Sequence, residues 1–208
     1  MVRLLDLLAA ERVVAILRGS SAAHACRAAE VIAGAGVRLL EVSLTTPDAL
    51  AAIAELTASL PPGCLVGAGT VLTAADAEAA AGAGAAFLVT PAVTPSVRRG
   101  VELGVPVLAG ALTPTEIWTA MDAGAAAIKL FPASFGGVAH LAALRQPLPG
   151  VPFVPVGGVD RDAADAYLAA GAVAVGVGSP LVGRAAEDGD LAGLAARAAS
   201  FAALRVAP

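Results

Sequence analysis

A glycine followed by a short run of aliphatic and β-branched residues recurs along the chain, and its spacing restricts the fold more than any other feature. The runs follow each other at intervals of 20 to 27 residues, after an opening run, RVVAILRG. They begin at Gly36, Gly63, Gly84, Gly104, Gly124, Gly150 and Gly171. Alanine-rich segments with helical periodicity separate them, and several open with a Ser, Thr or Asp that can cap a helix. We expect the glycine after each helix to be its C-cap.

Eight strands, each followed by a helix in a unit of this length, predict a compact (β/α)8 barrel. We expect one domain over residues 1–208, with a short N-terminal helix before the first strand. The competing architecture is a doubly wound open sheet, which usually has fewer strands and a glycine-rich turn after the first one. The first run here is followed by RGSS, which is not a dinucleotide-binding fingerprint. The spacing therefore favours the barrel.

A mean hydropathy of +0.81 raises the question of a membrane protein. Two long uncharged stretches, 79–97 and 166–183, are broken by Gly, Thr, Ser or Pro and each joins a helix-like half to a strand-like half. Parallel strands buried on both faces have the same hydropathy, so we expect a soluble, cytoplasmic protein. Asp6, Glu11 and Arg12 interrupt the apolar N-terminal segment, which therefore lacks a signal-peptide core.

Charge and cysteine content exclude further classes. The net charge is −4, with scattered basic residues, which argues against a nucleic-acid surface. Cys26 and Cys64 are too few for a disulfide framework, and we expect two ordinary buried thiols.

Lys129 is the only lysine in the chain, and it stands inside the apolar run AAAIKLFPAS. The two-residue period of a strand places it on one face with Ala127 and Phe131, pointing into the barrel. The guanidinium of arginine is always protonated and is a poor nucleophile. A desolvated lysine amine can instead attack a ketone and form a Schiff base. The position therefore predicts covalent chemistry.

Glu41 lies in the second strand, LLEVSLTT, and is the one acidic residue embedded in a strand-like run. It is expected to face inward with Ser43 and Thr45. The second and sixth strands are opposite each other in a ring of eight, so Glu41 can approach Lys129 across the interior. One alternative is a buried ion pair without catalytic function, and another is a lysine that extends to solvent from the strand end.

Other strand ends carry candidate binding groups. Arg18 ends the first strand, Thr70 ends the third, and Pro91 follows the fourth. Glycine-bearing loops follow the seventh and eighth strands, at residues 156–159 and 176–180. Backbone N–H groups in such loops can bind a phosphate, although the glycines could also serve tight turns alone.

Six segments in order, LLEVSLTTPDA, VGAGTVL, FLVTPAV, IKLFPAS, FVPVGGV and AVGVGSPLV, resemble the class I KDPG/KHG aldolase family over nearly the whole chain. KDPG is 2-dehydro-3-deoxy-phosphogluconate, also called 2-keto-3-deoxy-6-phosphogluconate, and KHG is 4-hydroxy-2-oxoglutarate. The resemblance implies a (β/α)8 subunit, usually in a homotrimer. It also implies cleavage of a phosphorylated 2-keto-3-deoxy sugar acid to pyruvate and glyceraldehyde 3-phosphate.

By position, the resemblance makes Lys129 the Schiff-base lysine and Glu41 the general acid and base. It places Thr70 at the pyruvyl carboxylate, and Pro91 and Phe131 on the pocket walls. The residues that would hold the phosphate are Gly157, Gly158, Gly178 and Ser179.

One position departs from part of the family. Some members carry arginine where this chain has Thr45, whereas others resemble this chain in carrying arginine at AILR, here Arg18. The resemblance therefore assigns carboxylate binding to Arg18. The preferred substrate, gluconate or galactonate series and phosphorylated or not, stays open.

The sequence leaves three alternative functions: a metal-dependent aldolase, a phosphosugar isomerase or epimerase, and a binding protein. A metal-dependent aldolase fits poorly because His24 and His140 stand alone, so no metal and no cofactor is expected. A phosphosugar isomerase or epimerase would use Glu41 as a proton shuttle and need no imine. A sugar-phosphate-binding protein without turnover would gain its positive charge equally well from arginine.

Overall fold

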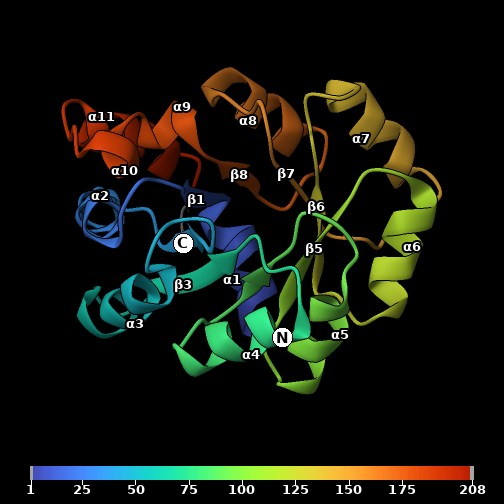
Figure 1. Ribbon diagram of the computed structural model, residues 1–208. Coiled ribbons are helices and arrows are strands. Elements are labelled where there is room, and N and C mark those ends of the chain that lie inside the picture. Colours follow the sequence, from blue (N-terminus) through green and yellow to red (C-terminus); the bar gives the residue numbers. More distant parts are fainter. Residues whose placement is uncertain (1, 207–208) are drawn as a thin grey trace.

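The computed structural model describes residues 2–206, which form the predicted (β/α)8 barrel. Helices α2 to α8 surround the strands (Figure 1). The strands are β1 (Val13–Leu17), β2 (Leu39–Ser43), β3 (Leu65–Gly69), β4 (Leu88–Val89), β5 (Val107–Ala111), β6 (Ala127–Leu130), β7 (Phe153–Pro155) and β8 (Val175–Val177). The helices are α1 (Val2–Glu11), α2 (Ala22–Gly34), α3 (Ala49–Ser59), α4 (Ala74–Gly82), α5 (Pro95–Glu102), α6 (Pro114–Asp122), α7 (Gly137–Arg145), α8 (Arg161–Ala169), α9 (Ser179–Val182), α10 (Ala185–Asp188) and α11 (Leu194–Ala202).

The eight strands form one parallel sheet in the order β7-β6-β5-β4-β3-β2-β1-β8. A parallel bridge between Val156 and Gly176 joins its two outer strands, so the sheet closes into a ring. Closure excludes the open doubly wound sheet. It also brings the carboxyl ends of all eight strands to one mouth of the barrel.

Two apolar clusters separate the inside of the ring from its outside. The inner cluster includes Leu39 of β2 and Ala127 of β6, whereas Leu40 and Ile128 belong to the cluster between strands and helices. The predicted alternation in both strands is therefore confirmed. Glu41 and Lys129 follow two residues after Leu39 and Ala127, so they share the inner face.

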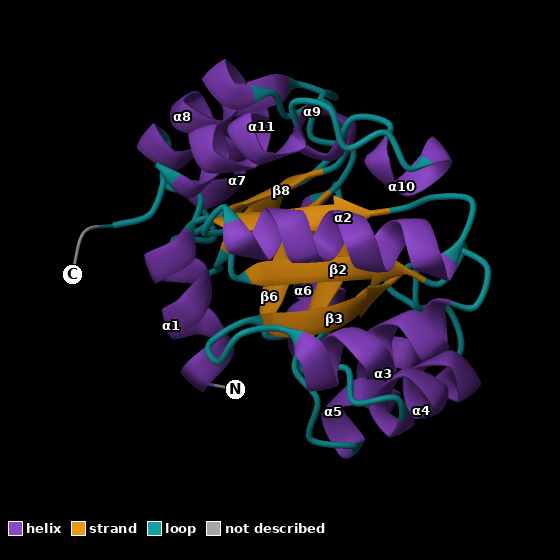
Figure 2. Ribbon diagram, turned by 90° about the vertical axis from the view of Figure 1, so that its left-hand side faces the viewer, coloured by secondary structure: helices purple, strands orange, loops and turns teal. Residues whose placement is uncertain are grey.

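Helix α1 closes the amino-terminal end of the barrel, opposite the mouth. Its Leu4 and Leu8 are buried in the inner cluster with Phe87, and the helix lies across the starts of the strands in Figure 2. The interior is thereby sealed at this end, and polar groups inside it open only toward the mouth.

The expectation that the glycine at the end of a helical segment caps the helix is confirmed for five helices. Five of them follow a helix C-cap residue and have positive φ: Gly36, Gly84, Gly104, Gly124 and Gly171. The repeat glycines Gly63 and Gly150 instead lie in proline-containing loops, several residues after the ends of α3 and α7.

The thiols are free, as expected, but only Cys26 is buried, and burial raises its pKa to about 11. Cys64 is half-buried, which corrects the expectation of two buried thiols. Among residues 2–206, no helix is long and apolar enough to cross a bilayer.

Candidate active site

Lys129 and Glu41 are both buried inside the barrel, near its mouth. Lys129 is 5% exposed, which excludes a side chain extending into solvent. Its Nζ lies 5.2 Å from the ring centroid of Phe131, within reach of a cation–π interaction. Glu41 is 2% exposed. The amino group of the only lysine and the carboxyl group of Glu41 therefore face the same apolar interior.

The carboxyl group of Glu41 does not form an ion pair with Lys129 in the described part of the chain. Its Oε1 has no hydrogen-bond partner within the described part of the chain, and no ion pair joins Glu41 to Lys129 there. Burial raises the pKa of Glu41, and the nearby charges of Lys129 and Arg18 offset part of that rise. A buried carboxyl that lacks a partner and has a raised pKa is typical of a functional site.

Glycines of β3 make room for this carboxylate. A Cβ added at Gly69 would lie 1.9 Å from Glu41 Oε1. Gly69 is in register with Ser43, two residues closer to the mouth than Glu41. The side chain of Glu41 therefore bends toward the open end of the barrel, over the backbone of β3.

Hydroxyl groups line the ends of β2 and β3. Ser43 Oγ lies 2.8 Å from Thr45 Oγ1 and 2.9 Å from Thr70 Oγ1. Thr70 has φ of 60°, a left-handed conformation that is costly for a β-branched residue. Strain of this kind persists where surrounding structure enforces it, often at functional sites.

Pro91 is fixed by the preceding residue, Thr90, which is fully buried. The Thr90 hydroxyl donates to the Ala92 carbonyl at 2.6 Å and accepts from the Gly110 N–H at 3.1 Å. A Cβ at Gly110 would lie 2.2 Å from the carbonyl carbon of Pro91, so only glycine lets β5 approach this closely. The sequence does not identify Thr90 as a support, because a threonine before proline is common in loops.

A cavity of about 320 Å³ opens at the ends of β1, β7 and β8. Six of the predicted site residues line it: Arg18, Phe131, Gly157, Gly158, Gly178 and Ser179. The other four, Glu41, Thr70, Pro91 and Lys129, lie outside its lining. Phe131 connects the two sets, since its ring lines the cavity and also faces the Lys129 ammonium. The structure thus divides the predicted site residues into two groups, one lining this cavity and one inside the barrel, with Phe131 between them.

The loop that carries Arg18 is held from two sides. The Gly19 N–H donates to the buried Thr46 hydroxyl at 3.2 Å. On the other side, the Ser20 N–H donates to the Ala186 carbonyl of α10 at 3.2 Å. A Cβ at Gly19 would lie 1.7 Å from that same carbonyl oxygen, so the contact requires glycine.

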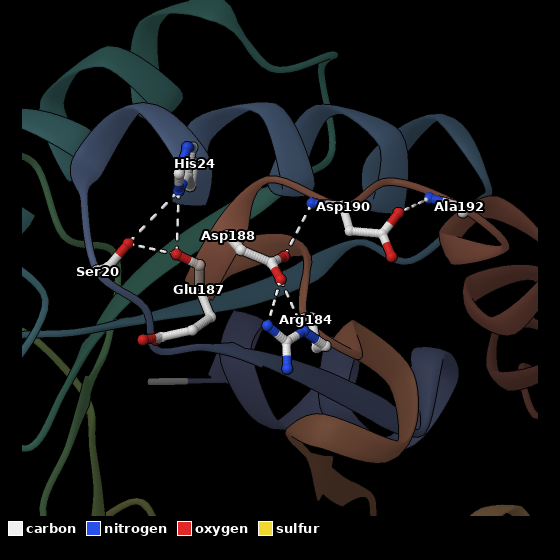
Figure 3. Close-up of polar contacts among 7 residues, drawn as sticks. All are labelled: Ser20, His24, Arg184, Glu187, Asp188, Asp190 and Ala192. Atoms are coloured by element: carbon white, nitrogen blue, oxygen red, sulfur yellow. Dashed lines mark hydrogen bonds and ion pairs between the residues drawn. The ribbon is translucent and has the colours of Figure 1, made fainter.

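Side chains reinforce the contact between this loop and α10 (Figure 3). The Ser20 hydroxyl donates to the Glu187 carbonyl, and His24 Nδ1 lies 3.2 Å from the same oxygen. Arg184, the residue before α10, forms an ion pair with Asp188 at the end of that helix. Because α10 follows α9 and the loop of Gly178, these contacts connect Arg18 to the glycine loop after β8. Sequence reasoning missed Thr46 and Ser20, which carry no signal apart from their place in the fold.

Neither histidine belongs to a metal site in the described residues. No group of three or more His, Cys, Asp and Glu side chains gathers anywhere in residues 2–206. His140 Nε2 lies 2.8 Å from the Leu112 carbonyl, which ties α7 to the loop after β5.

Comparison with known proteins shows the family to which the chain belongs. The family model described as KDPG and KHG aldolase matches residues 5–196. The 2-dehydro-3-deoxy-6-phosphogalactonate aldolase of Escherichia coli K12 is 35% identical over 170 residues, which cover 81% of this chain and 83% of that protein.

Two solved structures are similar throughout. The 2-keto-3-deoxy-6-phosphogluconate aldolase of Zymomonas mobilis ZM4, with 3-phosphoglycerate, has a TM-score of 0.88 and 32% identity over 100% of this chain and 99% of its own. The KDPG aldolase of Legionella pneumophila, with pyruvate captured as a covalent carbinolamine, has a TM-score of 0.86 and 28% identity over 97% of this chain and 98% of its own. The chain therefore belongs to the KDPG/KHG aldolase family and is a lyase of the aldolase type.

Proposed function

We propose that this aldolase cleaves 2-keto-3-deoxy-6-phosphogluconate to pyruvate and D-glyceraldehyde 3-phosphate through a Schiff base on Lys129. The observation that carries the proposal is a lone buried lysine that shares the barrel interior with a buried, unpartnered carboxyl. The pyruvate adduct of the Legionella relative supports covalent chemistry on a keto acid.

The reaction follows from this pair. The Lys129 amine attacks the C2 ketone, and loss of water leaves a protonated imine that withdraws electrons from the C3–C4 bond. Glu41 accepts the proton of the C4 hydroxyl through a water, the C3–C4 bond breaks, and an enamine remains. Protonation of C3 and addition of water to the imine release pyruvate and restore the free amine.

The anion-binding groups hold the two ends of the substrate. The loops of Gly157–Gly158 and Gly178–Ser179 bind the phosphate through backbone N–H groups. Thr70 binds the pyruvyl carboxylate. The resemblance assigned Arg18 to the carboxylate, but its place on the cavity wall with the glycine loops favours the phosphate end. Binding at both ends would position the C3–C4 bond between Lys129 and Glu41.

Borohydride reduction in the presence of pyruvate tests the proposal. Peptide mass spectrometry should find a reduced pyruvyl group on Lys129, and Lys129→Arg should lose both the label and the activity. Glu41→Gln should still acquire the label, slowly, while losing most of its aldol turnover. An active enzyme that takes no label would overturn the Schiff-base mechanism and favour an isomerase or epimerase, which needs no imine.

The galactonate epimer is the second candidate substrate, because the E. coli relative is named for it. An assay coupled to lactate dehydrogenase measures pyruvate release from both phosphorylated epimers and from 4-hydroxy-2-oxoglutarate. We expect the highest kcat/KM with 2-keto-3-deoxy-6-phosphogluconate. Activity should persist in EDTA, since the proposed mechanism uses no metal. The sequence predicts a cytoplasmic enzyme, and the family resemblance predicts a homotrimer.

A further inference from the structure

Three hydroxyl groups form a chain at the carboxyl ends of β2 and β3. Ser43 stands in the middle, with its Oγ 2.8 Å from Thr45 Oγ1 and 2.9 Å from Thr70 Oγ1. Ser43 is fully buried, whereas Thr45 is exposed and Thr70 is half-buried. The chain therefore leads from solvent, through a side chain that no substrate can touch, to Thr70.

The number of hydrogens limits which hydroxyl of this hydrogen-bonded series can donate to a ligand. Each hydroxyl has one hydrogen and can accept two hydrogen bonds. Ser43 Oγ also accepts from the Thr45 N–H at 3.4 Å, so it can accept from one neighbouring hydroxyl and must donate to the other. Two of the three hydrogens are used within the chain, and the third points outward at one end. The chain thus has two directions, which differ in whether Thr70 or Thr45 has the free hydrogen.

The backbone holds Thr70 in place at its end of the chain. Its φ of 60° is unfavourable for a β-branched residue. The flanking residues are fixed by main-chain bonds, from Leu44 N–H to the Gly69 carbonyl at 2.8 Å and from Val71 N–H to the Val89 carbonyl at 3.2 Å. The Thr70 hydroxyl consequently has a defined position, and only its hydrogen is free to turn.

We propose that Ser43 is a positioning residue that commits the Thr70 hydroxyl to donating toward the carboxylate of the keto acid. The inference rests on the proposed function, in which Thr70 binds that carboxylate. An anion selects the direction in which Thr45 donates to Ser43, Ser43 donates to Thr70, and Thr70 donates to the carboxylate. Hydrogen bonds in such a series polarise one another, so the bond to the anion is strengthened by the two behind it.

The consequence is selectivity for a charged keto acid over a neutral one. Removing Ser43 Oγ leaves Thr70 free to turn its hydrogen away and removes the polarisation. Affinity for a carboxylate should fall, while the chemistry at Lys129 continues once the substrate is bound. An uncharged ester, which attracts the hydroxyl hydrogen more weakly, should be affected much less.

The experiment is borohydride labelling of Lys129 at increasing pyruvate concentration, with methyl pyruvate as the uncharged comparison. Ser43→Ala should raise the half-saturating pyruvate concentration about 3- to 10-fold, as expected for loss of one neutral hydrogen bond. The limiting labelling rate should stay within about 2-fold, and the methyl pyruvate curve should barely move.

Thr45→Val keeps the inference testable if Ser43→Ala fails to fold, because Thr45 is exposed. It should raise the half-saturating pyruvate concentration about 2- to 3-fold. Thr45→Ser, which keeps the hydroxyl, should have the wild-type value. Identical pyruvate curves in all folded variants, or equal shifts with pyruvate and methyl pyruvate, would overturn the role of Ser43. A wild-type protein without label would overturn the proposed function itself.

Discussion

At the scale of the residue, Glu41 is the side chain to which we assign proton transfer in the proposed mechanism. Its carboxyl group is buried among apolar strands, and its Oε1 has no partner among the described residues. Water stabilises a carboxylate far better than this interior does, so burial raises the pKa toward the range useful for a general base near neutral pH. The burial of this carboxyl group therefore costs stability when the group is ionised.

Glu41→Gln should stabilise the protein at neutral pH. The folded-state pKa of Glu41 is raised above its ordinary value of 4.5, so the folded protein binds the proton more tightly and loses stability as pH rises above that value. Glutamine does not titrate and removes this loss. Thermal unfolding should show Tm of Glu41→Gln above that of the wild type by about 2 °C or more at pH 7.5, with a smaller difference at pH 4.

The matched control is Glu30→Gln, at an exposed position of α2. It should change Tm by less than about 2 °C at either pH, as is usual for surface substitutions. A Tm of Glu41→Gln below that of the wild type at pH 7.5 would contradict the burial argument.

Arg18 is exposed and lines the cavity with the glycine loops. Arg18→Gln should therefore lower kcat/KM about 10-fold or more for the phosphorylated substrate, in keeping with loss of a charge-assisted hydrogen bond. The loss with unphosphorylated 4-hydroxy-2-oxoglutarate should stay below about 3-fold. Steady-state kinetics with both substrates measure these losses. Equal losses of kcat/KM with the two substrates would show that Arg18 binds the carboxylate instead of the phosphate.

At the scale of the element, β3 (LVGAG) shows why a strand carries glycine at two inward-facing positions. A Cβ at Gly67 would lie 2.4 Å from the Phe87 ring, and a Cβ at Gly69 would lie 1.9 Å from Glu41 Oε1. Both glycines occupy the inner face, where the large side chains of Glu41 in β2 and of Phe87, just before β4, lie across them. The two glycines of VGAG thus leave the space that the side chains of Phe87 and Glu41 occupy.

Gly69→Ala should displace the Glu41 carboxyl group and reduce aldol turnover about 100-fold or more, the range in which general acid–base catalysis contributes. The far-UV circular dichroism spectrum should stay that of the wild type, because the clash is confined to one side chain. Normal turnover in a folded Gly69→Ala protein would show that Glu41 can act from another position.

Gly82→Ala is the control for this exchange. Gly82 lies in α4, and a Cβ there would meet nothing within 4 Å. Alanine stabilises a helix by about 0.5 to 1 kcal/mol relative to glycine, so Tm should rise by about 1 to 4 °C with activity unchanged.

At the scale of the whole molecule, ring closure creates the site. The strand ends that carry Arg18, Glu41, Lys129 and the glycine loops belong to five different strands, and only the bridge between Val156 and Gly176 makes them neighbours around one mouth. With α1 sealing the other end, substrate and water reach the interior from one side.

The subunit should form a homotrimer in solution. Three copies of the 20.2 kDa chain give about 61 kDa, which light scattering coupled to gel filtration measures directly. Trp118 and Phe135 are 67% and 64% exposed, unusual positions for large aromatic rings in a chain of few aromatics. A mass of one chain at micromolar concentration would contradict the prediction.

The sequence alone determined the architecture and the two central residues. Repeat spacing specifies strand–helix units, and the two-residue period of a strand decides which side chains face inward, so Lys129 and Glu41 could be placed from local pattern. Tertiary structure decided what depends on contacts between distant segments. Examples are the division of the predicted site residues between the barrel interior and the cavity, the support of the Arg18 loop by Thr46 and α10, and the hydroxyl chain through Ser43. The physical reason is that hydrogen bonds and close packing act over a few ångströms in space, and residues brought that close by ring closure are unrelated in sequence.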